Sequence, residues 1–204
     1  MTLTLHHCQG SRSFRAVWAL EEMGLSYELV KWPFPPRALA KEYLAVNPLG
    51  TVPFLIDGPV RLTESAAICQ YLADRHGPTS LGVKPEEDAY GEYLNWLHQS
   101  DATLTFPLAI RLRYTFVEPP ERRLAQAVED YGKFYLGRLR WAEAALSDGR
   151  EFLCAGRFTM ADIAIGYALQ LGTFQKRADQ FPPHVAAYFE RLAQRPAYQR
   201  ALEK

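Results

Sequence analysis

The stretch that decides the fold is Asn47-Pro48-Leu49-Gly50-Thr51-Val52-Pro53-Phe54-Leu55, with Leu62-Thr63-Glu64-Ser65-Ala66-Ala67-Ile68 a short distance after it. A proline directly before a short apolar run cannot donate to a sheet ladder, so Pro53 marks the entry to a strand. An X-Pro bond at such a turn is a good candidate for the cis form. We expect a cis Val52-Pro53 bond to expose the Val52 N–H and C=O at a sheet edge, where a peptide ligand can pair with them.

The Glu64-Ser65 pair stands where a helix is expected to begin. The free N–H groups of a helix N-terminus favour a carboxylate, and Glu64 would take a ligand ammonium group. A capping interpretation is equally open, with Thr63 as N-cap and Glu64 as a first-turn acid. The ligand-binding and capping interpretations can both hold. Together, the segments 47–55 and 62–68 predict a site for a small, zwitterionic, peptide-like molecule.

The composition of the 204-residue chain excludes several partners. Lys plus Arg and Asp plus Glu both number 23, so the formal charge is zero, and neither nucleic acid nor an anionic membrane is expected as a partner. No secretory signal and no membrane-spanning apolar run is visible. The three distant cysteines and five scattered histidines form no disulfide framework and no metal pattern. We expect a cytoplasmic protein without a metal.

The hydrophobic pattern divides the chain into two parts. Residues 1–77 alternate strands and helices in the order βαβαββα, and residues 78–85 form a linker. Residues 86–204 carry only helical spacing, so the fold class is α/β plus all-α. The expected strands are 2–7, 27–32, 54–57 and 60–62, and the expected helices are 13–24, 38–46, 64–76, 86–116, 121–146, 159–172 and 183–202 with a break at Pro196.

The turn after the first strand contains two serines, Ser11 and Ser13. One of them is expected to be a helix N-cap, while the hydroxyl of the other would face a ligand atom held as an anion. A hydroxyl that donates to a thiolate favours the charged form and lowers the pKa of the thiol. Cys8 offers an alternative, because Cys8-x-x-Ser11 has the spacing of a monothiol redox site. A lone cysteine at a strand end is, however, more often a packing residue.

Four segments together resemble a cytosolic glutathione S-transferase, over nearly the whole chain and in the expected order. They are Ser11 with Arg15-Ala16-Val17, the segment 47–53, the helix start 64–68, and Thr159 to Asp162, which also has the spacing of a capping box. The resemblance implies that residues 1–77 form a thioredoxin-like domain that binds glutathione. It also implies that residues 86–204 supply the acceptor pocket of a homodimeric detoxification enzyme, which conjugates glutathione to small electrophilic, apolar substrates.

The resemblance also assigns residues. Serine-type, theta-like bacterial members place the thiol-activating hydroxyl four residues before an arginine, a spacing that Ser11 and Arg15 match. Cysteine-type members carry their cysteine where this chain has Arg12. Thr51 stands where relatives often carry a lysine against the glycine carboxylate. The other implied contacts are Val52 and Pro53 for the cysteinyl residue, Glu64 and Ser65 for the γ-glutamyl end, Arg37 or Lys41 for the glycine carboxylate, Asp101 for the glutathione amine across a dimer, and Phe106 and Tyr114 for the acceptor pocket.

Two alternatives to conjugation stay open on the sequence alone. One is a glutathione-dependent redox enzyme, a disulfide reductase or peroxidase, that uses Cys8. The other is a non-catalytic regulatory scaffold that keeps the fold of a glutathione transferase. The joint presence of Ser11, Val52-Pro53 and Glu64-Ser65 favours the enzyme.

Overall fold

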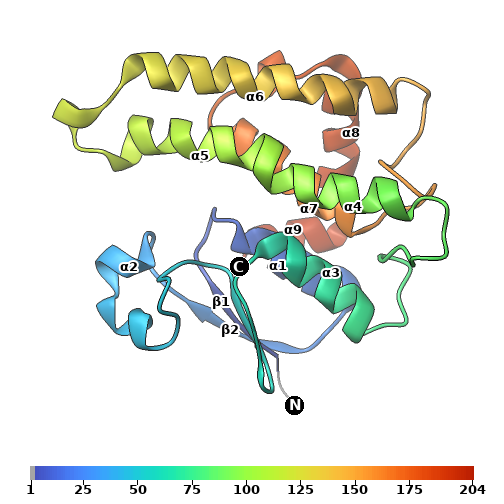
Figure 1. Cartoon of the computed structure of the whole chain (residues 1–204), viewed down its shortest axis with the longest axis horizontal. Coiled ribbons are helices and arrows are strands. Elements are labelled where there is room, and N and C mark those ends of the chain that lie inside the picture. Colours follow the sequence, from blue (N-terminus) through green and yellow to red (C-terminus); the bar gives the residue numbers. More distant parts are fainter. Residues whose placement is uncertain (1–2) are drawn as a thin grey trace. The chain divides into compact units, whose positions relative to one another are not determined.

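The computed structural model describes residues 3–204 and divides them into two compact units (Figure 1). The first contains the chain up to Gly82 together with Ala193–Lys204, and the second contains Val83–Leu192. The division after Gly82 falls inside the segment 78–85. The last helical segment, expected with the helical domain, packs with the first unit instead.

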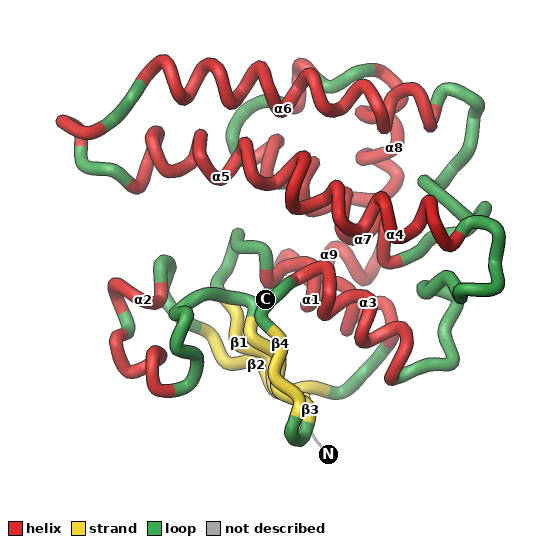
Figure 2. The backbone as a smooth tube through the Cα atoms, in the orientation of Figure 1, coloured by secondary structure: helices red, strands yellow, loops and turns green. Residues whose placement is uncertain are grey.

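The first unit is built on a mixed sheet of four strands, which lie side by side in Figure 2. The sheet order is β2-β1-β3-β4, with β1 parallel to β2 and antiparallel to β3. At its centre the fully buried Leu5 lies opposite Leu29 on one side and Leu55 on the other. The strands are β1 (Leu3–His7), β2 (Tyr27–Lys31), β3 (Phe54–Asp57) and β4 (Val60–Leu62).

The helices of the first unit complete the predicted order βαβαββα. Helix α1 ends at Gly24, whose φ of 62° places it in the left-handed conformation that glycine favours at this position. The single helix expected at 38–46 is wrong: Ala40 leaves the helical conformation, at φ −141° and ψ 76°, and divides the segment in two. The elements are α1 (Ser13–Met23), α2 (Pro36–Leu39), a short 3-10 helix (Lys41–Ala45), α3 (Ser65–Arg75) and α9 (Pro196–Leu202).

Helix α9 belongs to the first unit because its aromatic side chain packs on α1. The ring of Tyr198 meets the edges of Phe14 and Trp18, with centroids 5.3 and 4.9 Å apart. Such edge-to-face contacts contribute about 0.5–1.5 kcal/mol each beyond the buried area. Two ion pairs also join the segments, Arg195 with Glu22 and Arg200 with Glu21.

The second unit is entirely helical. One long stretch runs from Tyr90 to Val117, and a wide π-helical segment interrupts it just before Pro107. Proline has no N–H to donate and crowds the preceding turn, so a wide turn relieves both constraints. The elements are α4 (Tyr90–Gln99), a π-helix (Ser100–Thr105), α5 (Phe106–Leu112), a second π-helix (Arg113–Val117), α6 (Ala125–Leu146), α7 (Met160–Phe174) and α8 (Pro183–Ala193), with 3-10 turns at Pro120–Arg122 and Ala178–Gln180.

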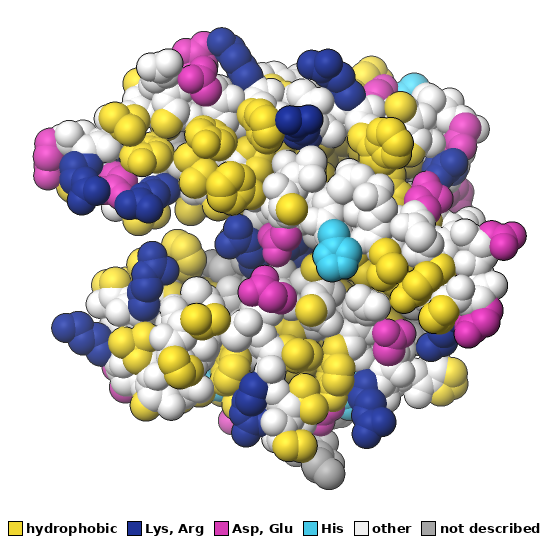
Figure 3. All heavy atoms as spheres, in the orientation of Figure 1, with side chains coloured by type: hydrophobic (Ala, Val, Ile, Leu, Met, Phe, Trp, Pro, Cys, Tyr) yellow, Lys and Arg dark blue, Asp and Glu magenta, His cyan; other side chains and the backbone are white. Residues whose placement is uncertain are grey.

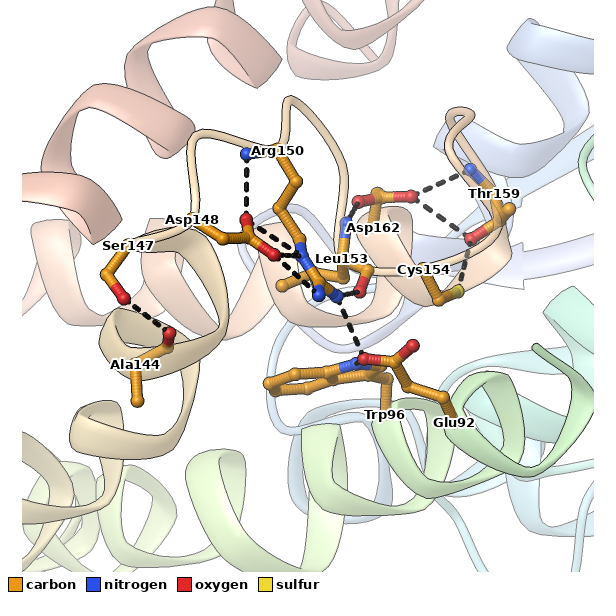
Figure 4. Close-up of polar contacts among 10 residues, drawn as sticks. All are labelled: Glu92, Trp96, Ala144, Ser147, Asp148, Arg150, Leu153, Cys154, Thr159 and Asp162. Atoms are coloured by element: carbon orange, nitrogen blue, oxygen red, sulfur yellow. Dashed lines mark hydrogen bonds and ion pairs between the residues drawn. The ribbon is translucent and has the colours of Figure 1, made fainter.

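A capping box fixes the start of α7, as the spacing of Thr159 and Asp162 predicts (Figure 4). Asp162 is fully buried, and its carboxylate accepts the Thr159 N–H at 2.7 Å and the Leu153 N–H at 3.0 Å. The hydroxyl of Tyr188, from α8, also donates to it at 2.9 Å. Burial raises the pKa of Asp162, and these donors oppose that rise. One carboxylate therefore connects the loop at Leu153, the start of α7, and α8.

Replacing Asp162 with alanine should destabilise the protein by about 3–5 kcal/mol, because several buried donors lose their acceptor. Urea unfolding measures this change. The matched control is Asp148→Ala, which removes an exposed carboxylate paired with Arg150 and should cost no more than about 1 kcal/mol. Equal losses in the two variants would contradict the role given to Asp162.

Two features of residues 3–204 bear on function. No helix in that range has the length and apolar character needed to cross a membrane. Over the same residues, no group of three or more His, Cys, Asp or Glu side chains is arranged to hold a metal ion.

Candidate functional site

The turn between β1 and α1 carries a line of hydrogen-bonded side chains, called here the serine–histidine chain (Ser11, Ser13 and His7). The hydroxyl oxygens of Ser11 and Ser13 lie 2.6 Å apart, and the Ser13 oxygen lies 2.8 Å from Nδ1 of His7. The Ser11 hydroxyl also donates to the carbonyl oxygen of Cys8 at 2.8 Å. The Ser13 N–H donates to the Ser11 oxygen at 3.2 Å, within the turn. The expectation that one serine is the helix N-cap is wrong, because the N-cap of α1 is Arg12, which makes no side-chain capping bond.

The direction of the serine–histidine chain follows from the hydrogen bonds of His7. Nε2 of His7 is buried and has no hydrogen-bond partner in residues 3–204. Burial, reinforced by the charge of Lys31, lowers the pKa of His7 to about 4, so the ring is neutral at pH 7. An orphaned N–H costs more than an orphaned lone pair, so we assign the proton to Nδ1. Nδ1–H then donates to Ser13, Ser13 to Ser11, and the Ser11 hydroxyl to the Cys8 carbonyl.

Ser11, Ser13 and Cys8 are the three residues whose side chains could face a ligand sulfur, and they differ in solvent exposure. Ser11 is 8% exposed, whereas Cys8 is 1% and Ser13 0% exposed. Burial also raises the pKa of the Cys8 thiol to about 11, and the thiol donates to the carbonyl oxygen of Pro33 at 3.6 Å. Of the three, Ser11 is therefore the residue most open to a ligand, with Ser13 and His7 behind it.

The loop before β3 presents backbone groups next to a cis proline. The Val52-Pro53 bond is cis, as the sequence predicts. The side chains of Tyr43 and Asn47 both donate to the carbonyl oxygen of Thr51, at 2.8 and 2.9 Å, and so fix the loop. Within the described residues, the N–H and C=O of Val52 make no hydrogen bond. These are the free backbone groups that a peptide-like ligand needs.

Two exposed cationic side chains, those of Arg37 and Lys41, lie close in sequence to the loop before β3. Gly50 has a φ of +60°, and a Cβ there would lie 2.6 Å from Cβ of Arg37, so the backbone of α2 packs closely on the loop. The side chains of Arg37 and Lys41 are exposed, and neither makes a hydrogen bond or ion pair with residues 3–204. Both remain predicted partners for the glycine carboxylate.

The start of α3 differs in one respect from the sequence prediction. The N-cap is Glu64, with extended backbone, and not Thr63, so the capping interpretation is wrong in that detail. The Glu64 side chain is exposed and makes no capping bond. Ser65 is buried, and its hydroxyl oxygen accepts a hydrogen bond from Nη1 of the fully buried Arg15 at 2.9 Å. Arg15 thus holds the start of α3 against α1, while the Glu64 carboxylate stays free for a ligand.

Three predicted site residues belong to the second unit. Asp101 lies in the first π-helix, Phe106 begins α5 with half of its surface exposed, and Tyr114 lies in the second π-helix. Figure 3 shows hydrophobic side chains gathered over α5 and α6 on the face drawn. The roles of these three residues stay predictions.

Sequence reasoning did not identify the contributions of His7 and Arg15. Both are almost fully buried polar residues whose partners, Ser13 and Ser65, lie on other elements. A histidine at the end of a mostly buried strand was the one available signal, because a buried imidazole needs a partner.

Acid should destabilise the protein through His7. Its pKa is lowered on folding, so between the ordinary value of 6.5 and about 4 the unfolded state binds the extra proton, and stability falls as the pH falls. The contribution is at most about 1.4 kcal/mol per pH unit. Urea unfolding at pH 7 and pH 5 should show a smaller loss in His7→Asn than in the wild type.

The matched control for that measurement is His98→Asn, at an exposed histidine of α4, which should keep the wild-type pH dependence. If His7→Asn also keeps the full pH dependence, His7 is not the buried neutral group described above.

The arrangement has the form of a thioredoxin-like unit, with a serine turn after β1 and a cis proline directly before β3, followed in the chain by an all-helical unit. Comparison with known proteins agrees. The glutathione S-transferase N-terminal domain matches residues 1–74, and the glutathione S-transferase C-terminal domain matches residues 136–191. Glutathione S-transferase 4 of Zea mays is 32% identical, over 90% of this chain and 83% of its own. The chain belongs to the glutathione S-transferase family.

Solved structures show the same fold. The glutathione transferase URE2P6 from Phanerochaete chrysosporium, in complex with oxidized glutathione, is 27% identical with a TM-score of 0.85, over 99% of this chain and 95% of that one. Ure2p5 from the same organism, cocrystallized with 1-(S-glutathionyl)-2,4-dinitrobenzene, is 26% identical with a TM-score of 0.84, over 99% and 93%. The predicted fold class, α/β plus all-α, is confirmed.

Proposed function

We propose that this protein is an active glutathione transferase that binds glutathione, stabilises its thiolate and adds it to small electrophilic, apolar substrates. The observation that carries the proposal is the Ser11 hydroxyl, which ends the serine–histidine chain and is the most exposed of the groups that could face a sulfur. The relatives crystallised with oxidized glutathione and with a glutathionyl dinitrobenzene support the ligand and the type of reaction.

Glutathione binds, in this proposal, through backbone and charge. The free N–H and C=O of Val52 pair with the cysteinyl residue as an added strand would. The Glu64 carboxylate takes the ligand ammonium, and the backbone N–H of Ser65 at the start of α3 takes the γ-glutamyl carboxylate. Arg37 or Lys41 takes the carboxylate of the glycine end. The neutral overall charge suits this zwitterionic ligand.

The thiol is activated by a change of acceptor at Ser11. Its hydroxyl turns from the carbonyl oxygen of Cys8 to the ligand sulfur. The Cys8 carbonyl oxygen still accepts a hydrogen bond from the Ser11 N–H at 3.2 Å, so the rotation of the hydroxyl leaves no buried acceptor without a partner. Lowering a thiol pKa from about 8.5 to roughly 6–7 takes about 2–3 kcal/mol, and one hydrogen bond to a charged acceptor contributes about 1.5–3 kcal/mol. Ser13 and His7 strengthen the donor by polarising it.

Conjugation then needs little more from the protein. The thiol proton passes to solvent, and a sulfur lone pair forms a C–S bond with the electrophilic carbon. On an aryl halide the halide leaves with its bonding electrons. Phe106 and Tyr114, in the helical unit, are the residues we propose for the apolar acceptor pocket.

We also propose that the protein is a cytoplasmic homodimer, in which Asp101 would contact the glutathione amine bound by the other subunit. Light scattering gives the mass in solution. A monomer that conjugates glutathione at the full rate would remove Asp101 from the site.

Burial argues against redox chemistry through Cys8. A thiol that is 1% exposed, with a pKa raised to about 11, is a poor nucleophile at neutral pH. Cys8→Ser should therefore leave conjugation intact. A disulfide reductase activity that disappears in this variant would restore the redox alternative. A protein that binds glutathione and conjugates none of a panel of electrophiles would instead be a regulatory scaffold.

The substitution Ser11→Ala should raise the pKa of the bound thiol toward its free value of about 8.5 and lower kcat about 10–100-fold near pH 6.5, with little loss of glutathione affinity. Ultraviolet thiolate absorbance and 1-chloro-2,4-dinitrobenzene turnover measure the two effects. Ser13→Ala keeps the Ser11 hydroxyl and removes the neighbouring hydroxyl that polarises it. This variant should raise the pKa of the bound thiol by less than Ser11→Ala does. The exposed Ser26→Ala is the control. An unchanged thiolate titration in Ser11→Ala would contradict the assignment of Ser11 as the group that stabilises the thiolate.

A further inference from the structure

Two arginines of the helical unit meet at one point on α6. Arg111 comes from the last turn of α5, and Arg177 from the segment after α7. A Cβ added at Gly132 would lie 2.8 Å from Nη2 of Arg177 and 3.4 Å from Nε of Arg111. Both guanidinium groups therefore occupy the space that a side chain at position 132 would need.

No carboxylate among residues 3–204 pairs with either arginine. Their hydrogen-bond partners are neutral amides: Arg111 donates to the Gln175 side chain at 2.8 Å, and Arg177 to that of Gln180 at 3.3 Å. Nε of Arg111 and Nε of Arg177 are both buried and have no hydrogen-bond partner within that range. Unpaired buried N–H groups are rare in folded proteins, so two of them on adjacent cations call for an acceptor.

The acid nearest in the chain does not supply that acceptor. Glu129 lies one turn before Gly132 on α6, and the charge of Arg177 acts on it. Its carboxylate is nevertheless paired with Lys133, at 2.6 Å. Burial lowers the pKa of Arg111, and the neighbouring charge of Arg177 lowers it further. Two like charges are thus held together, and no carboxylate of the described chain is ion-paired with either of them.

The buried side-chain amide of Gln175 fixes the position of the Arg111 side chain. Gln175 is 2% exposed. Its side-chain oxygen accepts from Arg111, and its side-chain nitrogen donates to the carbonyl oxygen of Leu108 at 2.9 Å. Both arginines are partly exposed, so an ion from solvent can reach part of each side chain, although the two Nε atoms themselves are buried. Paired guanidinium forks match the oxygens of phosphate and sulfate.

We propose that Arg111 and Arg177 form a binding site for a small oxyanion of the phosphate or sulfate type, either free or carried on a small molecule. The site lies within the helical unit and is independent of the serine–histidine chain. Its ligand supplies a counter-charge and acceptor oxygens to the two guanidinium groups and offsets the repulsion between them.

The test is thermal unfolding in phosphate and in sodium chloride at equal ionic strength. Phosphate at ten times its Kd shifts the folding equilibrium about tenfold, about 1.4 kcal/mol, which raises Tm by about 3–6 °C for a chain of this size. Arg177→Gln should lose this increase. In chloride alone the variant should be at least as stable as the wild type, because one of two repelling charges is gone.

The control is Arg140→Gln, which removes the same charge from an exposed position of α6 and should keep the phosphate effect. Calorimetric titration with inorganic phosphate and with phenyl phosphate separates the two sources of the anion: tighter binding of the ester indicates an oxyanion carried on a small molecule. Arg111→Gln should abolish both titrations. The proposal is overturned if phosphate raises the wild-type Tm no more than chloride does, or raises that of Arg177→Gln equally.

Discussion

The serine–histidine chain in the turn after β1 is the constraint on which the site depends. A neutral, buried His7 orients Ser13, and Ser13 orients the Ser11 hydroxyl, which is the last donor of the line and donates to the Cys8 carbonyl oxygen. Each hydrogen bond in such a line polarises the next, so the Ser11 hydroxyl becomes a stronger donor than the hydroxyl of an isolated serine. The same turn begins α1, from which Arg15 reaches the start of α3. This turn therefore fixes both the Ser11 hydroxyl and the start of α3, the two places where we propose that the ligand binds.

Much of the fold could be predicted because its signals are local. The bounds predicted for β3 and β4 match the structure, in which Asp57 pairs with Val60 and Gly58-Pro59 forms the two-residue turn that fixes the register. The break at Ala40 and the docking of α9 could not be predicted. The first depends on how the loop packs against Gly50, and the second on Tyr198 meeting aromatic rings of α1 far away in the sequence.

The candidate site likewise has parts that could be predicted from the sequence and parts that could not. The cis bond before Pro53 could be predicted because only proline makes that bond common. The N-cap at Glu64 was missed by one residue, as helix ends often are, because adjacent polar residues can each take the position. The bond between Ser13 and His7, and the meeting of Arg111 with Arg177 at Gly132, join residues without any sequence period. Such contacts emerge from the packing of whole elements.

The central claim is that glutathione pairs with the Val52 backbone beside the cis proline, and substitution of a side chain cannot remove a backbone group. The most direct measurement is therefore a glutathione titration followed by amide NMR of the labelled protein. The account predicts that the Val52 amide proton moves downfield and exchanges more slowly with solvent as glutathione saturates its site. Saturation with glutathione while the Val52 amide keeps its shift and its exchange rate would contradict the account.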